Sequence, residues 1–385
     1  MRKICVVTGS RAEYGLLRGL MYKIKASDIA VLQIIATNMH LLPQYGETYK
    51  DIESDGFVVD EKVYMHRKGD TSDCIIESMS VELVNMNAAV KRLSPDLIVI
   101  LGDRYEMFAV AIVALMNNIP MAHIHGGEIT EGAFDDAIRH SLTKMSLYHF
   151  VSTEEYRYRV IQMGEDPERV FYVGSLGVEN IHLEPRLSKR EIEAFLGVNL
   201  DIPTVLVTYH PETRCCKDVA INNILDALSY FDKLQIIFTR PNSDPGSDKI
   251  NKAIEYFSQK NMHRVKLFSS LGIIRYLSLI PYLKAVIGNS SSGIIEVPSF
   301  GIPTLNIGDR QKGRVASSSV LHCNTDIDSI LTGIRTVLSS DFQNMAKNTK
   351  NPYDKEGTAE AIFDVISCCN LNSSKTFYDI KFDLL

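Results

Sequence analysis

The stretch DLIVILGDRYE, residues 96–106, contains a continuous apolar run that stops at Gly102 and Asp103. Short apolar runs of this kind, each ending in Gly, Ser, Asp or His, recur along the chain and are separated by longer amphipathic stretches. Such an alternation of strand and helix patterns predicts parallel β-sheets. Because the runs are continuous and do not alternate with polar residues, we expect strands that are covered by helices on both faces.

The apolar runs fall into two sets. We predict strands at 3–8, 29–37, 96–101, 121–124, 148–152 and 170–174 in the first set, and at 204–209, 234–239, 265–268, 285–287 and 304–307 in the second. The predicted fold class is therefore α/β, with two Rossmann-type, doubly wound parallel-sheet domains that face each other across a cleft. We place the N-terminal domain at 1–178 and the C-terminal domain at 187–368, with the tail at 369–385 as a candidate addition to the N-terminal domain.

Composition limits the classes of partner. The chain has 385 residues and a net charge of −6, from 41 Lys and Arg against 47 Asp and Glu. This balance argues against nucleic acid and anionic membranes and favours a small-molecule partner. No apolar run reaches the roughly 18 residues that a membrane-spanning helix needs, so we expect a cytoplasmic protein. The seven cysteines include no C-x-x-C pair, which predicts reduced thiols and no zinc site.

In the first half, charged side chains follow the predicted strands at their carboxyl ends, where doubly wound sheets bind ligands. They are Arg11, Asp103, Arg104, His123, His125, Glu128, Asp135, Asp136 and Arg139. Such a cluster suits a metal site or a metal-free acid–base site. Two histidines at a spacing of two would point to opposite faces of a strand, which favours the metal-free site. For Arg11 a solvated turn, and for Arg104 a structural ion pair with Asp103, are the simpler interpretations.

In the second half, the loop GNSSSGIIE at 288–296 lies between a predicted strand and a predicted helix. Its backbone N–H groups and serine hydroxyls suit a diphosphate, and Glu296 suits the hydroxyls of a ribose. Arg310, in GDRQKGR, adds positive charge. A serine-rich helix cap without a ligand is the alternative. The dinucleotide fingerprint G-x-G-x-x-G is absent from the first strand–helix turn, which predicts that no nicotinamide cofactor binds there.

Seven motifs taken together resemble the hydrolysing UDP-N-acetylglucosamine 2-epimerases. In chain order between residues 9 and 314 they are GSRAEY, LGDRYE, HIHGGE, DDAIRH, HPET, GNSSSGIIEVP and GDRQKGR. The resemblance implies a GT-B-like fold, UDP held mainly by the C-terminal domain, the sugar in the cleft, and a homo-oligomer, commonly a dimer or tetramer. It also implies the reaction of UDP-GlcNAc with water to N-acetylmannosamine and UDP, for sialic acid and surface polysaccharide synthesis, without a metal or cofactor.

The resemblance also implies roles for particular residues. Asp103 matches a catalytic carboxylate, and Asp135 and Asp136 match a pair that includes another. The family motif H-I-E-G-G-E carries a glutamate where this chain has His125, so either His125 or Glu128 serves as the base at C2. The residues expected to bind the substrate are Arg11, Arg104, Arg139, His210, Asn242, Ser290, Ser291, Gly293, Glu296 and Arg310.

Four alternatives stay open at this stage. The substrate could be UDP-2,4-diacetamido-2,4,6-trideoxyglucose, the precursor of legionaminic acid in a related branch. A non-hydrolysing 2-epimerase would keep UDP on the sugar, and a GT-B glycosyltransferase would pass the sugar to an acceptor. A nucleotide-sugar sensor would bind without turnover.

Overall fold

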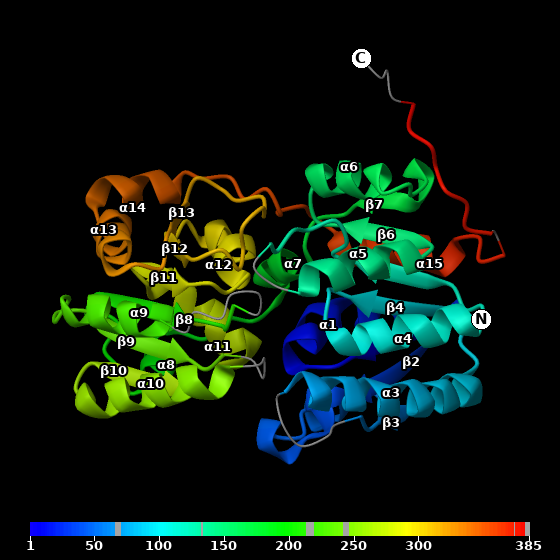
Figure 1. Ribbon diagram of the computed structural model, residues 1–385, viewed down its shortest axis with the longest axis horizontal. Helices are drawn as coiled ribbons and strands as arrows, with labels where there is room; N and C mark the ends of the chain where they lie inside the picture. The colour runs from blue at the N-terminus through cyan, green and yellow to red at the C-terminus, as the bar shows by residue number, and fades with distance from the viewer. Residues whose placement is uncertain (66–70, 132–133, 213–218, 242–245, 373, 382–385) are drawn as a thin grey trace. The chain divides into compact units, whose positions relative to one another are not determined.

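The computed structural model describes residues 1–65, 71–131, 134–212, 219–241, 246–372 and 374–381. The chain divides into two compact units (Figure 1). Unit 1 comprises Met1–Glu128, Asp135–Asn180 and Lys355–Leu385, and unit 2 comprises Ile129–Phe134 and Ile181–Asp354. The chain passes from unit 1 to unit 2 after Glu128 and again within helix α7 (Leu176–Leu183).

Unit 1 is built on a seven-stranded parallel sheet with the order β3-β2-β1-β4-β5-β6-β7. The strands are β1 (Arg2–Thr8), β2 (Ala30–Thr37), β3 (Glu61–Val63), β4 (Leu97–Leu101), β5 (Met121–Ile124), β6 (Tyr148–Val151) and β7 (Val170–Tyr172). The sequence order reverses direction at β1, between β2 and β4, as it does in doubly wound sheets. The carboxyl ends of β1 and β4 therefore mark the place where ligands bind in such sheets.

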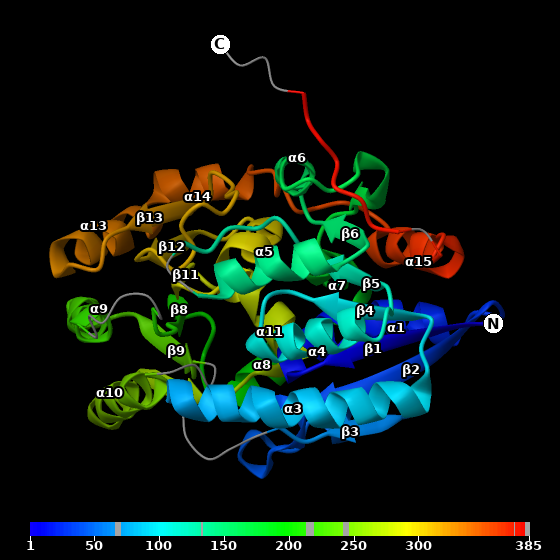
Figure 2. The ribbon, with the colours of Figure 1, turned by 45° about the vertical axis from the view of Figure 1, so that its right-hand side comes forward.

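Helices cover both faces of this sheet, as the continuous apolar runs predict. They are α1 (Arg11–Lys25), α2 (Tyr49–Ser54), α3 (Ser72–Leu93), α4 (Tyr105–Met116), α5 (Asp135–Met145), α6 (Glu154–Gln162) and α15 (Thr358–Cys368), with the 3₁₀ turns η1 (Asn38–Leu41), η2 (Pro43–Tyr45) and η3 (Pro167–Arg169). Val6 and Val99 pack with α1 and α15, whereas Val7 and Ile98 pack on the other face with α3, α4 and α5. Figure 2 shows α3, α4 and α5 in front of the strands.

Unit 2 contains a six-stranded parallel sheet with the order β10-β9-β8-β11-β12-β13. The strands are β8 (Thr204–Thr208), β9 (Gln235–Thr239), β10 (Val265–Phe268), β11 (Ala285–Gly288), β12 (Thr304–Ile307) and β13 (Val320–Cys323). The helices are α8 (Lys189–Leu196), α9 (Val219–Ser229), α10 (Ser247–Lys260), α11 (Gly272–Leu279), α12 (Ser292–Ile295), α13 (Ile327–Val337) and α14 (Ser340–Lys347), with η4 (Ile280–Tyr282) and η5 (Val297–Phe300). One face of the sheet packs on α9, α10 and α13.

The structure differs from the sequence-based boundaries at the C-terminus. The expected C-terminal domain ran to residue 368, but α15 groups with unit 1. Ala359, Ile362 and Ile366 are fully buried against α1 and the strands of sheet 1. Burial of these three apolar side chains explains why α15 packs in unit 1, although the residues just before it belong to unit 2. Within the described residues, no helix is both long enough and apolar enough to cross a bilayer.

Candidate active site

Arg139 brings three of the predicted motifs together in unit 1. Its side chain is 1% exposed, and its guanidinium forms an ion pair with Asp103, which follows β4. A second nitrogen, Nη1, donates to the backbone carbonyl of Glu128 at 2.9 Å and lies 3.6 Å from Oδ1 of Asp136. A buried guanidinium offers several donors in a fixed plane, so it can hold two carboxylates and a loop at once. The carboxylates remain accessible, since the Asp103 side chain is 24% exposed and that of Asp136 is 19% exposed.

His125 and Glu128 form a second pair beside this cluster. Nδ1 of His125 lies 3.4 Å from Oε1 of Glu128, and the Ser152 hydroxyl donates to the same carboxylate oxygen at 2.9 Å. His125 lies just beyond β5 with φ of +68°, in the left-handed region, and its N–H donates to the carbonyl of Phe150. A non-glycine residue in that region is strained, and such strain is concentrated at functional sites.

His123 lies underneath the cluster and differs in environment from His125. One of its ring nitrogens lies 2.7 Å from the carbonyl oxygen of Gly102, and the other lies 3.1 Å from the Thr143 hydroxyl. Burial lowers the pKa of His123 to about 3. The neutral ring of His123 contacts Gly102 and so fixes the turn that carries Asp103. His123 and His125 therefore have different partners, because His125 contacts Glu128.

Three further predicted residues of unit 1 lie at the same edge of the sheet. Asp135 is the first residue of α5. Arg11 is the first residue of α1, and its Nε lies 3.3 Å from Asp51, with both side chains about half exposed. Nε of Arg104 donates to Glu106 at 2.6 Å. The simple pairing of Arg104 with Asp103 is therefore not what these contacts show, because Arg139 is the arginine that pairs with Asp103.

In unit 2, Asn289 organises the predicted binding residues. Its side-chain oxygen accepts the N–H of His210 at 2.7 Å, and its amide nitrogen donates to the His210 carbonyl at 2.9 Å. Its backbone carbonyl accepts from Arg310 at 3.2 Å and from Gln311 at 3.0 Å. One fully buried amide thus ties the loops after β8, β11 and β12 together.

The serine loop leaves three consecutive donors available. Within the described residues, the N–H groups of Ser290, Ser291 and Ser292 have no backbone acceptor, whereas that of Gly293 donates to Ser290. Successive N–H groups of this kind form concave anion sites. Helix α12 has only four residues, so the dipole of a long helix, which the sequence suggested, contributes little here.

The remaining residues of this loop have structural partners. A Cβ atom at Gly293 would lie 2.8 Å from Cγ2 of Thr304, so this glycine allows close packing on β12. Glu296 follows α12 and its charge raises the pKa of Tyr276, after the larger effect of burial. The expected binding residue Asn242 lies outside the described residues.

Comparison with known proteins identifies the family of this site. The sequence profile of the family UDP-N-acetylglucosamine 2-epimerase matches residues 22–367. The chain belongs to this family. It is 44% identical over 344 residues to the hydrolysing GDP/UDP-N,N'-diacetylbacillosamine 2-epimerase of Campylobacter jejuni, with 89% of each chain covered. It is also 42% identical to the polysialic acid biosynthesis protein P7 of Escherichia coli, with 99% of this chain and 98% of that protein covered.

Solved structures confirm the GT-B-like fold of this family. The UDP-GlcNAc 2-epimerase of Neisseria meningitidis, bound to UDP-GlcNAc, superposes with a TM-score of 0.80 at 17% identity, over 94% of this chain and 99% of that one. The Methanocaldococcus jannaschii enzyme in complex with UDP-GlcNAc and UDP gives a TM-score of 0.79 at 17% identity, over 95% and 99% of the two chains.

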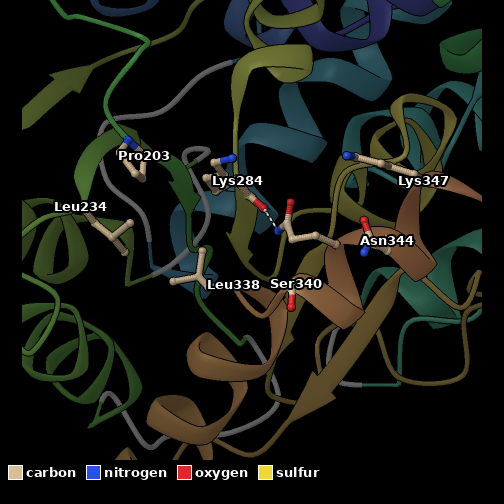
Figure 3. Close-up of a pocket in the computed structure, with 8 residues that line it drawn as sticks. Pro203, Leu234, Lys284, Leu338, Ser340, Asn344 and Lys347 are labelled. Carbon is tan, nitrogen blue, oxygen red and sulfur yellow. Dashed lines mark hydrogen bonds between the residues drawn. The ribbon is translucent and has the colours of Figure 1, made fainter.

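One hollow in unit 2 lies away from the serine loop. It has a volume of about 400 Å³ and is lined by Pro203, Leu234 and Lys284, among others (Figure 3). These three residues directly precede β8, β9 and β11 and so lie at the amino edge of the sheet. Ligands of doubly wound sheets bind at the carboxyl edge, where the serine loop lies. Among the described residues, no group of three or more His, Cys, Asp or Glu could hold a metal ion.

The residues that support the candidate site were not identified from the sequence. Asn289, Gln311 and Ser152 contact the predicted residues and were not singled out. Asn289 stands inside the quoted GNSSSG motif, and a polar residue directly after a strand glycine was the available signal. Gln311 likewise stands inside the quoted GDRQKGR motif, whereas the contact of Ser152 depends on which strands are neighbours.

Proposed function

We propose that this chain is a hydrolysing UDP-GlcNAc 2-epimerase, which converts UDP-GlcNAc and water to N-acetylmannosamine and UDP. The observation that carries the proposal is the arrangement around Arg139, which holds Asp103 and Asp136 beside the His125–Glu128 pair. The serine loop with Arg310 supplies donors for a diphosphate in unit 2. The E. coli relative named for polysialic acid biosynthesis supports a place in sialic acid supply.

The first chemical step is an anti elimination. A base removes the proton at C2 of the sugar, the C1–C2 double bond forms, and UDP departs with the electron pair of the C1–O bond, which leaves 2-acetamidoglucal. The side chain of His125 is 10% exposed and that of Glu128 is 2% exposed. Nδ1 of His125 faces Glu128, so Nε2 is the nitrogen that takes the proton and Glu128 is the carboxylate that orients the ring. Donors of the serine loop and Arg310 stabilise the charge that builds on the departing diphosphate.

The second step is hydration of the glycal. Water delivers its hydroxyl to C1, and a proton reaches C2 from the face opposite to the one that lost it, so C2 is inverted. Such a step needs an acid and a base on accessible carboxyl groups. Asp103 and Asp136 meet this requirement because both are partly exposed and both are held by Arg139.

A second substrate has its own support. The C. jejuni relative and a 33% identical relative from Legionella pneumophila, which covers 97% of both chains, are both named as hydrolysing 2-epimerases of diacetylbacillosamine nucleotides. That sugar carries an acetamido group at C4 and a methyl group at C6, whereas GlcNAc carries hydroxyls there. The elimination and hydration involve only C1 and C2, so the same residues would serve either substrate.

Proton NMR of the metal-free protein in deuterated water tests the proposal. With UDP-GlcNAc we expect free N-acetylmannosamine that carries deuterium at C2, together with UDP. If the protein turned over only the 2,4-diacetamido trideoxy nucleotide, that nucleotide would be its substrate, and the proposed elimination and hydration would still apply. Retention of UDP on the epimerised sugar would contradict the hydrolysing reaction, and absence of turnover with both nucleotides would contradict the proposed function.

A further inference from the structure

Behind the proposed active site, unit 1 buries three glutamates around a single arginine. Glu13 lies in the first turn of α1, Glu82 in α3 and Glu106 in the first turn of α4. Glu82 and Glu106 are fully buried, and Glu13 is 6% exposed. The arginine is Arg104, whose side chain is 15% exposed at the carboxyl edge of the sheet. Three carboxylates and one guanidinium would leave two uncompensated negative charges in a region of low dielectric, which is strongly unfavourable.

The hydrogen bonds of Thr37 indicate where one proton lies. Its hydroxyl oxygen is 2.9 Å from the carbonyl oxygen of Val63 and 3.0 Å from Oε1 of Glu82. A hydroxyl has one hydrogen, and a carbonyl oxygen can only accept. Thr37 cannot donate fully to both oxygens at once, so a full bond to Val63 leaves the Glu82 contact best satisfied by a proton on Glu82. This geometry favours a protonated Glu82, and burial, with the nearby charge of Glu106, raises the pKa of this carboxyl well above its usual value.

Glu13 competes with Glu106 for Arg104 and has the poorer contact. Nε of Arg104 lies 2.6 Å from Oε1 of Glu106 but 4.0 Å from Oε1 of Glu13. Glu13 accepts the N–H of Gly9 at 2.7 Å through Oε2, and its Oε1 is buried without a hydrogen-bond partner among the described residues. Burial and the charge of Glu106 raise the pKa of Glu13 to about 7.

Two other ionisable groups near this cluster, both among the described residues, keep one charge state near neutral pH. Burial raises the pKa of Tyr105, on α4, to about 12. Burial lowers the pKa of His40, in η1, to about 4, so that its ring is neutral. Compared with these two groups, the glutamates are the ones whose charge changes near pH 7.

We propose that Glu82 and Glu13 hold protons at neutral pH, so that Glu106 alone supplies the negative charge that positions Arg104. Loss of the Glu13 proton then adds a buried negative charge beside Arg104 and weakens productive binding of an anionic nucleotide sugar. The proton positions rest on the contacts and burial of these glutamates within unit 1. The consequence for binding rests on the proposed function. Glu13, Glu82 and Glu106 are positioning residues in this scheme, because they act through Arg104.

Infrared spectroscopy tests the protons independently of catalysis. At pH 8 the wild-type protein should show the carbonyl stretching band of a protonated carboxyl, and Glu82→Gln should lose that band. A second such band, lost in Glu13→Gln, should fade in the wild-type protein as pH rises through about 7. Glu77→Gln, which removes an exposed carboxylate from α3, is the matched control and should keep both bands. Identical bands in wild type and Glu82→Gln would overturn the proposal.

Steady-state kinetics between pH 7 and 9 test the consequence, with whichever of the two nucleotides is turned over. We expect kcat/KM of the wild type and of Glu77→Gln to fall about fivefold, as one partly screened charge develops beside Arg104, while that of Glu13→Gln stays level. If Glu13 had only a structural role, Glu13→Gln would change kcat/KM by the same factor at every pH, and its pH profile would keep the shape of the wild-type profile. Parallel profiles of Glu13→Gln and wild type would overturn the binding step. Absence of turnover would refute the proposed function, while the infrared bands still decide where the protons lie.

Discussion

At the scale of single residues, a substitution of Asp103 tests whether unit 1 carries catalysis while unit 2 binds UDP. In Asp103→Asn the side chain keeps its size and its oxygen acceptor for Arg139 but loses the negative charge. We expect turnover to fall by at least about 100-fold, the usual contribution of a general acid or base, and the Kd of UDP to stay within about twofold. Single-turnover assays and calorimetry measure the two effects, and Asp28→Asn, at an exposed position, is the control. Normal turnover in Asp103→Asn would refute its catalytic role.

Arg310 is expected to give the opposite result. Its guanidinium donates to the Asn289 carbonyl and is placed by the loop that also carries the serines. Arg310→Ala should raise the Kd of UDP about tenfold or more, because a charged donor to phosphate is lost. Arg335→Ala, which removes an exposed arginine from α13, should leave the Kd unchanged. Equal Kd values for both variants and the wild type would remove Arg310 from the binding site.

Residue types at strand ends were predictable, whereas their supports were not. The rule that ligands meet the carboxyl ends of parallel strands selected Asp103, Glu128 and Arg310 from the sequence. The pairing of Asp103 with Arg139 was not accessible in that way, since it depends on how α5 returns across the edge of the sheet. Hydrogen bonds such as those of Asn289 likewise arise only when two neighbouring strands bring their loops together.

At the scale of elements, the turn from β11 into the serine loop depends on Gly288. Its φ is +133°, and a Cβ atom there would lie 1.9 Å from the backbone oxygen of Thr208 on β8. Gly288→Ala should lower the free energy of unfolding by about 3 kcal/mol or more, because backbone must move. Gly197→Ala is the matched control, since its φ is +63° and no atom lies within 4 Å, and it should cost about 1 kcal/mol. Urea unfolding compares them, and equal losses would contradict the close-approach argument.

The elements that the sequence failed to predict are short strands at sheet edges. β3 and β13 have three and four residues and occupy the outer positions of their sheets. Both include polar residues, such as Lys62 and His322, and the edge position leaves them less covered than the central strands. The long apolar runs of β1, β4 and β8 were predicted because burial on two faces excludes polar residues from them.

At the scale of the whole molecule, the tail after α15 ties the C-terminus of the chain to the helix that carries Asp136 and Arg139. Nζ of Lys375 donates to the carbonyl of Ser146 at 2.6 Å and to that of Thr143 at 3.2 Å, at the end of α5. The same amine lies 2.6 Å from Glu165, which also receives a hydrogen bond from His149. Glu165 is therefore a buried carboxylate on which the tail, α5 and β6 depend together.

This carboxylate predicts how the fold responds to acid. Burial raises the pKa of Glu165, but the hydrogen bonds and charges of His149, Lys144 and Lys375 outweigh this effect and lower the pKa from 4.5 to about 2. The unfolded chain then binds the extra proton first as pH falls, so stability that is fully present above pH 4.5 is lost progressively down to pH 2.

Urea unfolding of Glu165→Gln at a series of pH values tests this assignment. Between pH 5 and 3 the free energy of unfolding should fall less steeply in Glu165→Gln than in the wild type, because the variant has no proton to bind at this position. Glu155→Gln, at an exposed position on α6, should follow the wild type. If Glu165→Gln lost stability toward acid as steeply as the wild type, the acid sensitivity would lie in other carboxylates.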